Sequence, residues 1–250
     1  MSDKTQWSHF QGKDALQHVI EAQRKAKSAQ SEIHGAELSS HAAAMADSAK
    51  ETVVLVFILW TLFAQYGIAS ERIHWLLIPF VLTWFIWRFS RSALLGWARL
   101  ERLHRLIEEE KWEIEHRRPQ EKEELYALYA AKGFSGKLLD EVVEVLMADD
   151  NRLLQVMLEE ELRLSLESFE HPLKTAAGTG AGVLGSAALL IAAGFTLPYW
   201  GALSVGAVII ASASGLTAKQ ERNEITPAIT WNLAIAAFAI FAAKWIGQLL

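Results

Sequence analysis

The sequence predicts an all-α polytopic membrane protein with five transmembrane helices and a cytosolic helical module between the second and the third. Two observations support this prediction. Hydrophobic residues make up 52% of the 250 residues and are gathered into runs close to the length that crosses a bilayer. The longest polar interruption, residues 97–170, carries 11 Lys+Arg against 19 Asp+Glu, a net charge of −8. The rest of the chain carries 13 basic and 10 acidic residues. The net charge of −5 for the whole chain is therefore the sum of a strongly acidic module and a mildly basic remainder.

Four segments follow from this division. They are a cytosolic helical leader at residues 1–50, transmembrane helices one and two at residues 51–93, the acidic module at residues 94–172, and transmembrane helices three to five at residues 173–250. Within the leader, hydrophobic periodicity predicts a modestly amphipathic helix over Asp14–Ile33 that Gly35 ends. The chain has no cysteine, which excludes disulfides, iron–sulfur clusters and thiolate zinc sites.

The apolar runs give the spans and their orientation. The predicted spans are Thr52–Ala69, Ile73–Phe89, Thr175–Leu197, Tyr199–Ala218 and Ala228–Leu250, with a tight turn at Ser70–Arg72. Arg88 and Arg91 close the second span, which places its C-terminal end in the cytoplasm. An odd number of spans then places the N-terminus and the module in the cytoplasm. In the third span, Gly178, Gly180, Gly182 and Gly185 are spaced for close helix packing.

The module reads as three or four helices. Leu94–His116 continues the second span as one long helix, and Pro119 fits the first turn of the next, which runs to Lys132 with Gly133 as its C-cap. Ser135 is placed to cap a third helix over residues 136–147. A fourth is expected from Asp149 or Asp150 to about residue 166.

Several carboxylates of the module have spacings that a metal site would use. Glu110 and Glu113 are three residues apart on one helix, Glu121 and Glu124 repeat the spacing on the next, and Met157 and Glu161 are four apart on the last. Hard divalent ions take several oxygen ligands, and a thioether adds softness toward transition metals. Glu-rich helices also serve as ordinary solvated faces, so spacing alone leaves both interpretations open. His34, His41 and Asp47 are of metal-ligating types, but their spacing does not require a site.

Nothing in the sequence indicates an enzyme. The chain lacks a nucleophile with a positioned base, a phosphate-binding Gly-rich loop and an HExxH pair. A ferroxidase centre on bundle helices would use more than the one ExxH pair found here, Glu101 and His104.

The order of elements and the motifs of the module resemble the vacuolar iron transporter family. The segment EKEELYALYAAKGFSGKLLDEVVEVLMADDNRLLQVMLEEELRLS is similar to the family's cytosolic metal-binding domain. That domain typically has one ExxE pair, a second before a Tyr and a "KG-[LF]-S" motif, and then a Met and a Glu on the last helix. The resemblance implies that the metal ligands are Glu110, Glu113, Glu121, Glu124, Met157 and Glu161. Leu158 stands where many members have a second Met.

The first two spans depart from the family pattern. The family's first span usually opens with an Asn-Asp-Gly-like signature whose Asp lies on the ion path, whereas this chain has ETVVLVFILW and then VLTWFIWRFSRS. Glu51 is the nearby acid and the candidate ion-path residue. Arg88 is expected to extend toward the interface. For Lys244 in the fifth span, a counter-ion within the bundle and a side chain directed to the outer surface are both open.

These observations lead to a functional expectation with alternatives. The resemblance implies a transporter that binds Fe²⁺, or Mn²⁺ or Zn²⁺, on the module and exports it from the cytosol by proton antiport. It also implies a homodimer in the bilayer. The absent ion-path signature leaves open a non-transporting metal buffer or sensor, and the acidic helices leave open a scaffold for a protein partner. No nucleic-acid partner is expected, and the lack of targeting signals favours a bacterial inner membrane.

Overall fold

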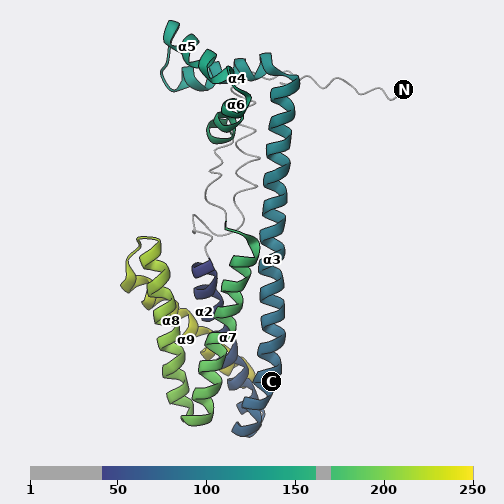
Figure 1. The fold of residues 1–250 in the computed structure, drawn as a ribbon. Helices are drawn as coiled ribbons and strands as arrows, with labels where there is room; N and C mark the ends of the chain where they lie inside the picture. The colour runs from purple at the N-terminus through teal and green to yellow at the C-terminus, as the bar shows by residue number, and fades with distance from the viewer. Residues whose placement is uncertain (1–40, 162–169, 250) are drawn as a thin grey trace, which may run out of the picture. The chain divides into compact units, whose positions relative to one another are not determined.

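The computed structural model describes residues 41–161 and 170–249 of the chain. Within these ranges every regular element is a helix (Figure 1), which confirms the all-α prediction. The described residues form two compact units. We call residues 98–161 the module, and residues 41–97 with 170–249 the bundle. The predicted leader helix and the residues after Glu161 in the predicted fourth module helix lie outside the described residues.

The bundle is built around α2. Its helices are α2 (His41–Gln65), the first part of α3 (Ser70–His116), α7 (Pro172–Thr196), α8 (Tyr199–Gln220) and α9 (Ile225–Gly247). α2 packs against α7, α8 and α9, and α7 lies along it in Figure 1. Val53, Phe57 and Trp60 of α2 meet Val183 and Leu190 of α7 in a continuous apolar core. This packing places α2 at the centre of the bundle.

Glycines bring the α2 and α7 backbones together. A Cβ atom on Gly178 would lie 2.1 Å from the carbonyl oxygen of His41, and one on Gly182 would lie 2.2 Å from that of Met45. The hydroxyl of Ser48 donates a hydrogen bond of 2.9 Å to the carbonyl of Thr179 at the same crossing. The expected role of these two glycines in close helix packing is therefore confirmed.

Among the described residues, four helices are long and apolar enough to cross a membrane: α3, α7, α8 and α9. α2 is not among them, so the count of five spans stays a prediction. The predicted second span and the helix after it are one continuous element, α3, as expected. The predicted end of the first span is wrong, because α2 stops at Gln65 and Gly67 turns the chain with a φ of +73°.

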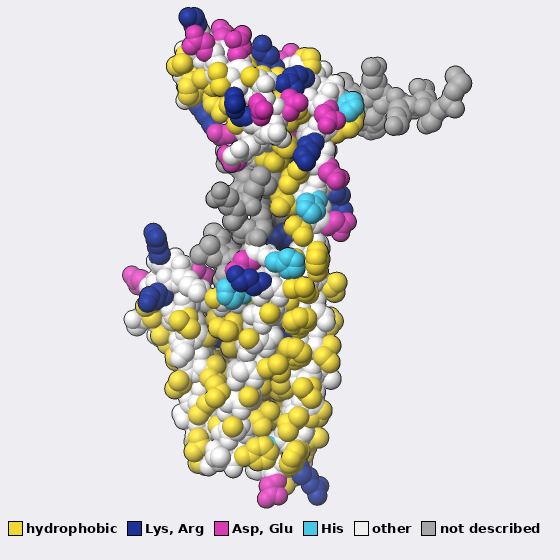
Figure 2. Space-filling model, viewed as in Figure 1, with side chains coloured by type: hydrophobic (Ala, Val, Ile, Leu, Met, Phe, Trp, Pro, Cys, Tyr) yellow, Lys and Arg dark blue, Asp and Glu magenta, His cyan; other side chains and the backbone are white. Residues whose placement is uncertain are grey.

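The outer face of the bundle visible in Figure 2 is covered by hydrophobic side chains. On α9, Trp231, Phe238 and Phe241 are 68%, 72% and 65% exposed. Exposed aromatic faces of this size are typical of surfaces that meet lipid. They agree with the membrane assignment.

The module comprises the end of α3 and four short elements. These are α4 (Arg118–Ala131), α5 (Gly136–Met147), α6 (Asp150–Val156) and a π-helical turn, η1 (Met157–Glu161). Ile114, Leu125, Val143, Leu153 and Met157 form its core. In Figure 2, charged side chains gather on the visible face of this unit.

The expected helix boundaries of the module are mostly confirmed. Pro119 lies in the first turn of α4, and Gly133 follows its C-cap with a φ of +97°. The carboxylate of Asp149 caps α6 by accepting a hydrogen bond of 2.8 Å from the backbone N–H of Arg152. The predicted start of the fourth helix is confirmed, and within the described residues the chain changes from α to π geometry at Met157. π-helical turns are rare in proteins overall, and those that occur are often at functional sites.

Polar contacts hold α4 against the elements that follow it. Arg118 lies 2.5 Å from the carboxylate of Asp150 and donates a hydrogen bond of 2.5 Å to the carbonyl of Met147. Lys132, next to the C-terminus of α4, forms an ion pair with Glu160 of η1. These contacts fix the π-helical turn beside α4.

Candidate metal site

The six predicted ligands lie on three elements of the module. Glu110 and Glu113 are on the last turns of α3, and Glu121 and Glu124 are on the first turns of α4. The two ExxE pairs therefore flank the turn between α3 and α4. Met157 and Glu161 begin and end η1, and the side chain of Glu161 lies outside the described part of the structure.

Three of these carboxylates are buried. The exposed fractions of Glu110, Glu121 and Glu124 are 4%, 0% and 1%. Glu is among the residue types least often fully buried. The interpretation of these helices as ordinary solvated Glu-rich faces is therefore wrong at these three positions.

The remaining described ligands differ in their surroundings. Met157 is fully buried and packs in the module core with Leu125 and Leu153. Glu113 keeps 18% of its side-chain surface exposed, and a carboxylate oxygen lies 4.0 Å from the guanidinium of Arg117. Leu158, at the place where many relatives have a second Met, is also buried. The thioether of Met157 therefore lies in the apolar core of the module.

The structure brings the ligands onto neighbouring elements without closing a coordination sphere in the described residues. Over residues 41–161 and 170–249, no group of three or more His, Asp or Glu side chains has the geometry to hold a metal ion. The ligand set therefore stays a prediction. The ExxH pair does not form such a centre either, because Glu101 forms an exposed ion pair of 3.0 Å with Arg105.

Burial determines what these carboxylates require chemically. Moving an ionised carboxylate out of water is strongly unfavourable unless hydrogen bonds, an opposite charge or a proton compensates. A divalent cation supplies two positive charges, and carboxylate oxygens are its preferred ligands.

A comparison with protein families matches residues 98–248, more than half of the chain, to the VIT family. The chain belongs to the VIT family. Members of this family are membrane transporters of metal ions, and they are not enzymes. The matched range contains all six predicted ligands and begins after Glu51. No match was found among curated proteins.

In this VIT-family chain, the candidate ion-path residue Glu51 is one half of an ion pair. Its carboxylate on α2 lies 2.8 Å from the guanidinium of Arg88 on α3, and Arg88 also lies over the ring of Trp84 at 5.9 Å. The sequence predicted that Arg88 extends toward the interface and that Glu51 is the candidate ion-path residue. Residues 37 positions apart give no sequence signal of pairing, so only the packing of α2 against α3 shows it. The role of Glu51 on an ion path stays a prediction.

A second polar cluster in the bundle was missed from the sequence. Glu170, which precedes α7, accepts a hydrogen bond of 2.6 Å from the backbone N–H of His41 and lies 2.9 Å from the ring nitrogen Nδ1 of the same residue. Lys174 donates a further hydrogen bond of 3.0 Å to it. Partial burial raises the pKa of Glu170, but the hydrogen bonds from His41 and Lys174 outweigh it and lower the pKa from 4.5 to about 2.

Two residues of metal-ligating types, His41 and Asp47, have partners within the bundle. His41 is engaged by Glu170 at the first turn of α2, where a carboxylate meets unsatisfied backbone N–H groups. Asp47 forms an ion pair of 2.7 Å with Lys50. Both side chains therefore have structural partners within the bundle.

Proposed function

We propose that this protein binds a divalent metal ion, Fe²⁺ or else Mn²⁺ or Zn²⁺, on the carboxylates of the module and exports it from the cytosol. Family membership supports transport of metal ions across a membrane. The observation that carries the choice of substrate is the burial of Glu110, Glu121, Glu124 and Met157 in one small helical unit. A solvated acidic surface would not need to place these groups in its interior.

The chemistry of capture follows from the ligand types. The transported ion exchanges part of its water shell for carboxylate oxygens, and the thioether of Met157 adds preference for a transition ion. Protons and metal ions compete for the same carboxylates, so acidification releases the metal. We therefore propose protons as the counter-substrate, as the family resemblance implies.

The proposal includes the setting of the molecule. The apolar helices support an integral membrane protein. We place the N-terminus and the module in the cytoplasm of a bacterial cell and the spans in the inner membrane, because the Arg residues after the second span favour the cytoplasmic side. We also propose a homodimer, as the family resemblance implies.

A second candidate function is a metal buffer or sensor that binds ions without moving them. The ion pair between Glu51 and Arg88 favours it, because a guanidinium 2.8 Å from the carboxylate opposes the approach of a cation there. The third candidate, a scaffold for a protein partner, would use the acidic helices without metal.

Flux and binding measured on the same preparation separate the three. The full-length protein is reconstituted in liposomes under a pH gradient, and entry of Fe²⁺, Mn²⁺ and Zn²⁺ is followed with a trapped fluorescent chelator. Entry that Glu121→Gln/Glu124→Gln abolishes supports transport, with Glu123→Gln, an exposed neighbour on α4, as the control. Saturable binding without entry identifies a buffer or sensor. The absence of both would leave the scaffold.

A further inference from the structure

The bundle contains a cavity of about 780 Å³. None of the residues that line it belongs to the module. It is lined by side chains of α2, α8 and α9, the three helices that pack on one another there. Its volume is within the range of sites that hold small molecules. The proposed metal function uses none of its lining residues.

The cavity is a groove with one buried wall and one open rim. Val53, Phe57 and Ile210 of the wall are 1%, 0% and 4% exposed. Trp200 and Phe241 line it from the rim and are 76% and 65% exposed. Small residues line the groove at Ala207 and Ala236. Gly206 lets α8 approach α2 closely, since a Cβ atom there would lie 2.5 Å from the ring of Phe57. The groove is therefore reachable from the apolar surface of the bundle.

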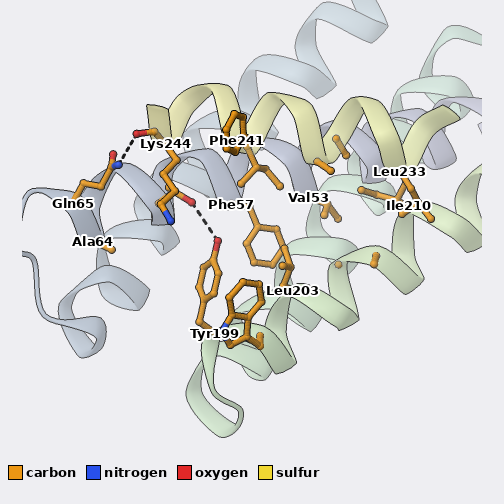
Figure 3. A pocket seen from close by; sticks show the side chains of 17 residues that line it. Val53, Phe57, Ala64, Gln65, Tyr199, Leu203, Ile210, Leu233, Phe241 and Lys244 are labelled. Atoms are coloured by element: carbon orange, nitrogen blue, oxygen red, sulfur yellow. Dashed lines mark hydrogen bonds between the residues drawn. The ribbon is translucent and has the colours of Figure 1, made fainter. Parts of the chain in front are cut away.

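The two ends of the groove differ in polarity. Figure 3 shows Gln65, Lys244 and Tyr199 toward one end, and Val53, Leu233 and Ile210 toward the other. At the polar end, the amide of Gln65 donates a hydrogen bond of 2.6 Å to the backbone carbonyl of Lys244. The hydroxyls of Thr61 and Tyr199 lie 3.3 Å apart beside it. A ligand that fits this groove has one polar and one long apolar part.

The charge and the length of the groove restrict further which class of ligand fits it. Lys244 is the one charged residue among the side chains that line the groove in the described structure, and the ion pairs among the described residues do not include it. From Leu233 to Lys244 the groove follows α9 over eleven helical steps, or roughly 17 Å at the rise of an α-helix. One leaflet of the hydrocarbon core measures about 15 Å, half of the bilayer core. Trp200 at the rim suits the level of the head groups.

We propose that this groove binds an anionic phospholipid, with one acyl chain between α2, α8 and α9 and the phosphate beside Lys244. The apolar wall accepts the chain, and the ammonium group selects a negatively charged head group. Lys244 would thus pair with the phosphate in the groove and also extend to the outer surface. The sequence had left open a counter-ion within the bundle and a side chain directed to the outer surface, and this placement combines the two. A lipid held there packs on Leu203 and Ile240, which are partly buried and lie against the apolar core of the bundle.

The test uses the full-length protein in detergent, offered phosphatidylglycerol and phosphatidylcholine, with bound lipid counted by native mass spectrometry. We expect preferential binding of phosphatidylglycerol, and Lys244→Gln should reduce this preference about fivefold, the contribution of one cation near a membrane surface. Lys219→Gln removes an exposed cation of α8 outside the groove and should leave the preference unchanged. Equal preference in the wild type and Lys244→Gln would overturn the proposal.

A second measurement locates the chain without relying on a substitution. Phosphatidylglycerol with a diazirine on its acyl chain is photolysed with the wild-type protein, and the labelled residues are mapped. Labelling of Leu203, Ala207 and Ile240, which line the groove and are partly exposed, supports the proposal. Labelling confined to the outer face of α9, at Trp231 and Phe238, contradicts the proposal. Crosslinking of the groove residues to a second copy of the chain, in place of the lipid, also contradicts it. Neither result depends on metal transport.

Discussion

Glu110, Glu121 and Glu124 are spread over two helices, and each is buried in the interior of the module. At the residue scale, this burial distinguishes them from the exposed acids beside them, such as Glu123. The same residue type therefore has two environments within one turn of α4. Removing the charge of a carboxylate that binds a metal ion should weaken metal binding, whereas removing the charge of a solvated carboxylate should not.

Glu121→Gln tests this distinction because it removes the charge and keeps the shape. We expect the affinity of the full-length protein for Fe²⁺ or Mn²⁺ to fall at least about tenfold, since even second-shell changes cost that much. Calorimetric titration in detergent measures it, with Glu123→Gln as the matched control. Unchanged affinity in Glu121→Gln would remove this residue from the ligand set.

Glu170 gives a prediction about pH. Its pKa in the folded protein is about 2, below the ordinary 4.5, so its contribution to stability is complete above about pH 4.5 and is lost as the pH falls toward 2. The Tm of the wild type should exceed that of Glu170→Gln at pH 6, and the two values should converge between pH 4.5 and pH 2.

Differential scanning fluorimetry over this pH range checks the convergence. Glu101→Gln, which removes a carboxylate from an exposed ion pair with Arg105, is the control and should show little difference at any pH. A gap between the wild type and Glu170→Gln that stayed constant down to pH 2.5 would contradict the assigned role of this carboxylate.

At the scale of the elements, the crossing of α2 and α7 is the tightest feature of the bundle. Gly178 and Gly182 meet backbone atoms of α2, which cannot move aside as a flexible side chain would. Gly185 is on the same helix, and an added Cβ atom would meet nothing within 4 Å there. The stripe of glycines therefore contains positions with opposite requirements.

Gly182→Ala should destabilise the bundle by about 1–3 kcal/mol, because the new methyl group forces the two backbones apart. Gly185→Ala should be neutral or stabilise by up to about 1 kcal/mol, since Ala is the better helix former. Thermal unfolding of both variants in the same detergent measures the difference. Equal Tm values for the two variants would show that the close α2–α7 crossing does not limit stability.

At the scale of the whole molecule, the number of membrane spans depends on whether α2 crosses the membrane. α3, α7, α8 and α9 have the length and composition to do so, and α2 carries Asp47, Lys50 and Glu51 in its first half. Yet α2 is the central helix of the bundle, and its buried residues include Val53, Phe57 and Trp60. An apolar helix at the centre of membrane-spanning neighbours is expected to cross with them.

The chain contains no cysteine, so single cysteines report topology without background. With five spans, Asp47→Cys, Lys137→Cys and Asn223→Cys should react with an impermeant maleimide from one side, and Tyr66→Cys from the other. Labelling of intact and opened vesicles measures this. Labelling of Asp47→Cys and Tyr66→Cys from the same side would show that α2 does not cross and that the chain has four spans.

The features that the sequence by itself determined are those that depend on residues close together in the chain. Apolar runs, Pro119, Gly133 and the capping Asp149 act on neighbouring residues, so the all-α class and most helix boundaries could be predicted. The motifs of the module were likewise enough to indicate the family, which the match over residues 98–248 shows. The change to π geometry at Met157 was not predictable, because the α and π patterns differ by one residue per hydrogen bond.

Only the tertiary structure decided which of these groups share a local environment. It buried Glu110, Glu121 and Glu124, joined Glu51 to Arg88 and His41 to Glu170, and left a groove that ends at Lys244. Each of these relations depends on the packing of helices far apart in the chain, whereas periodicity describes only one helix at a time. The sequence therefore names the donors of the candidate site, and the fold determines the charge, burial and partners that give them their chemistry.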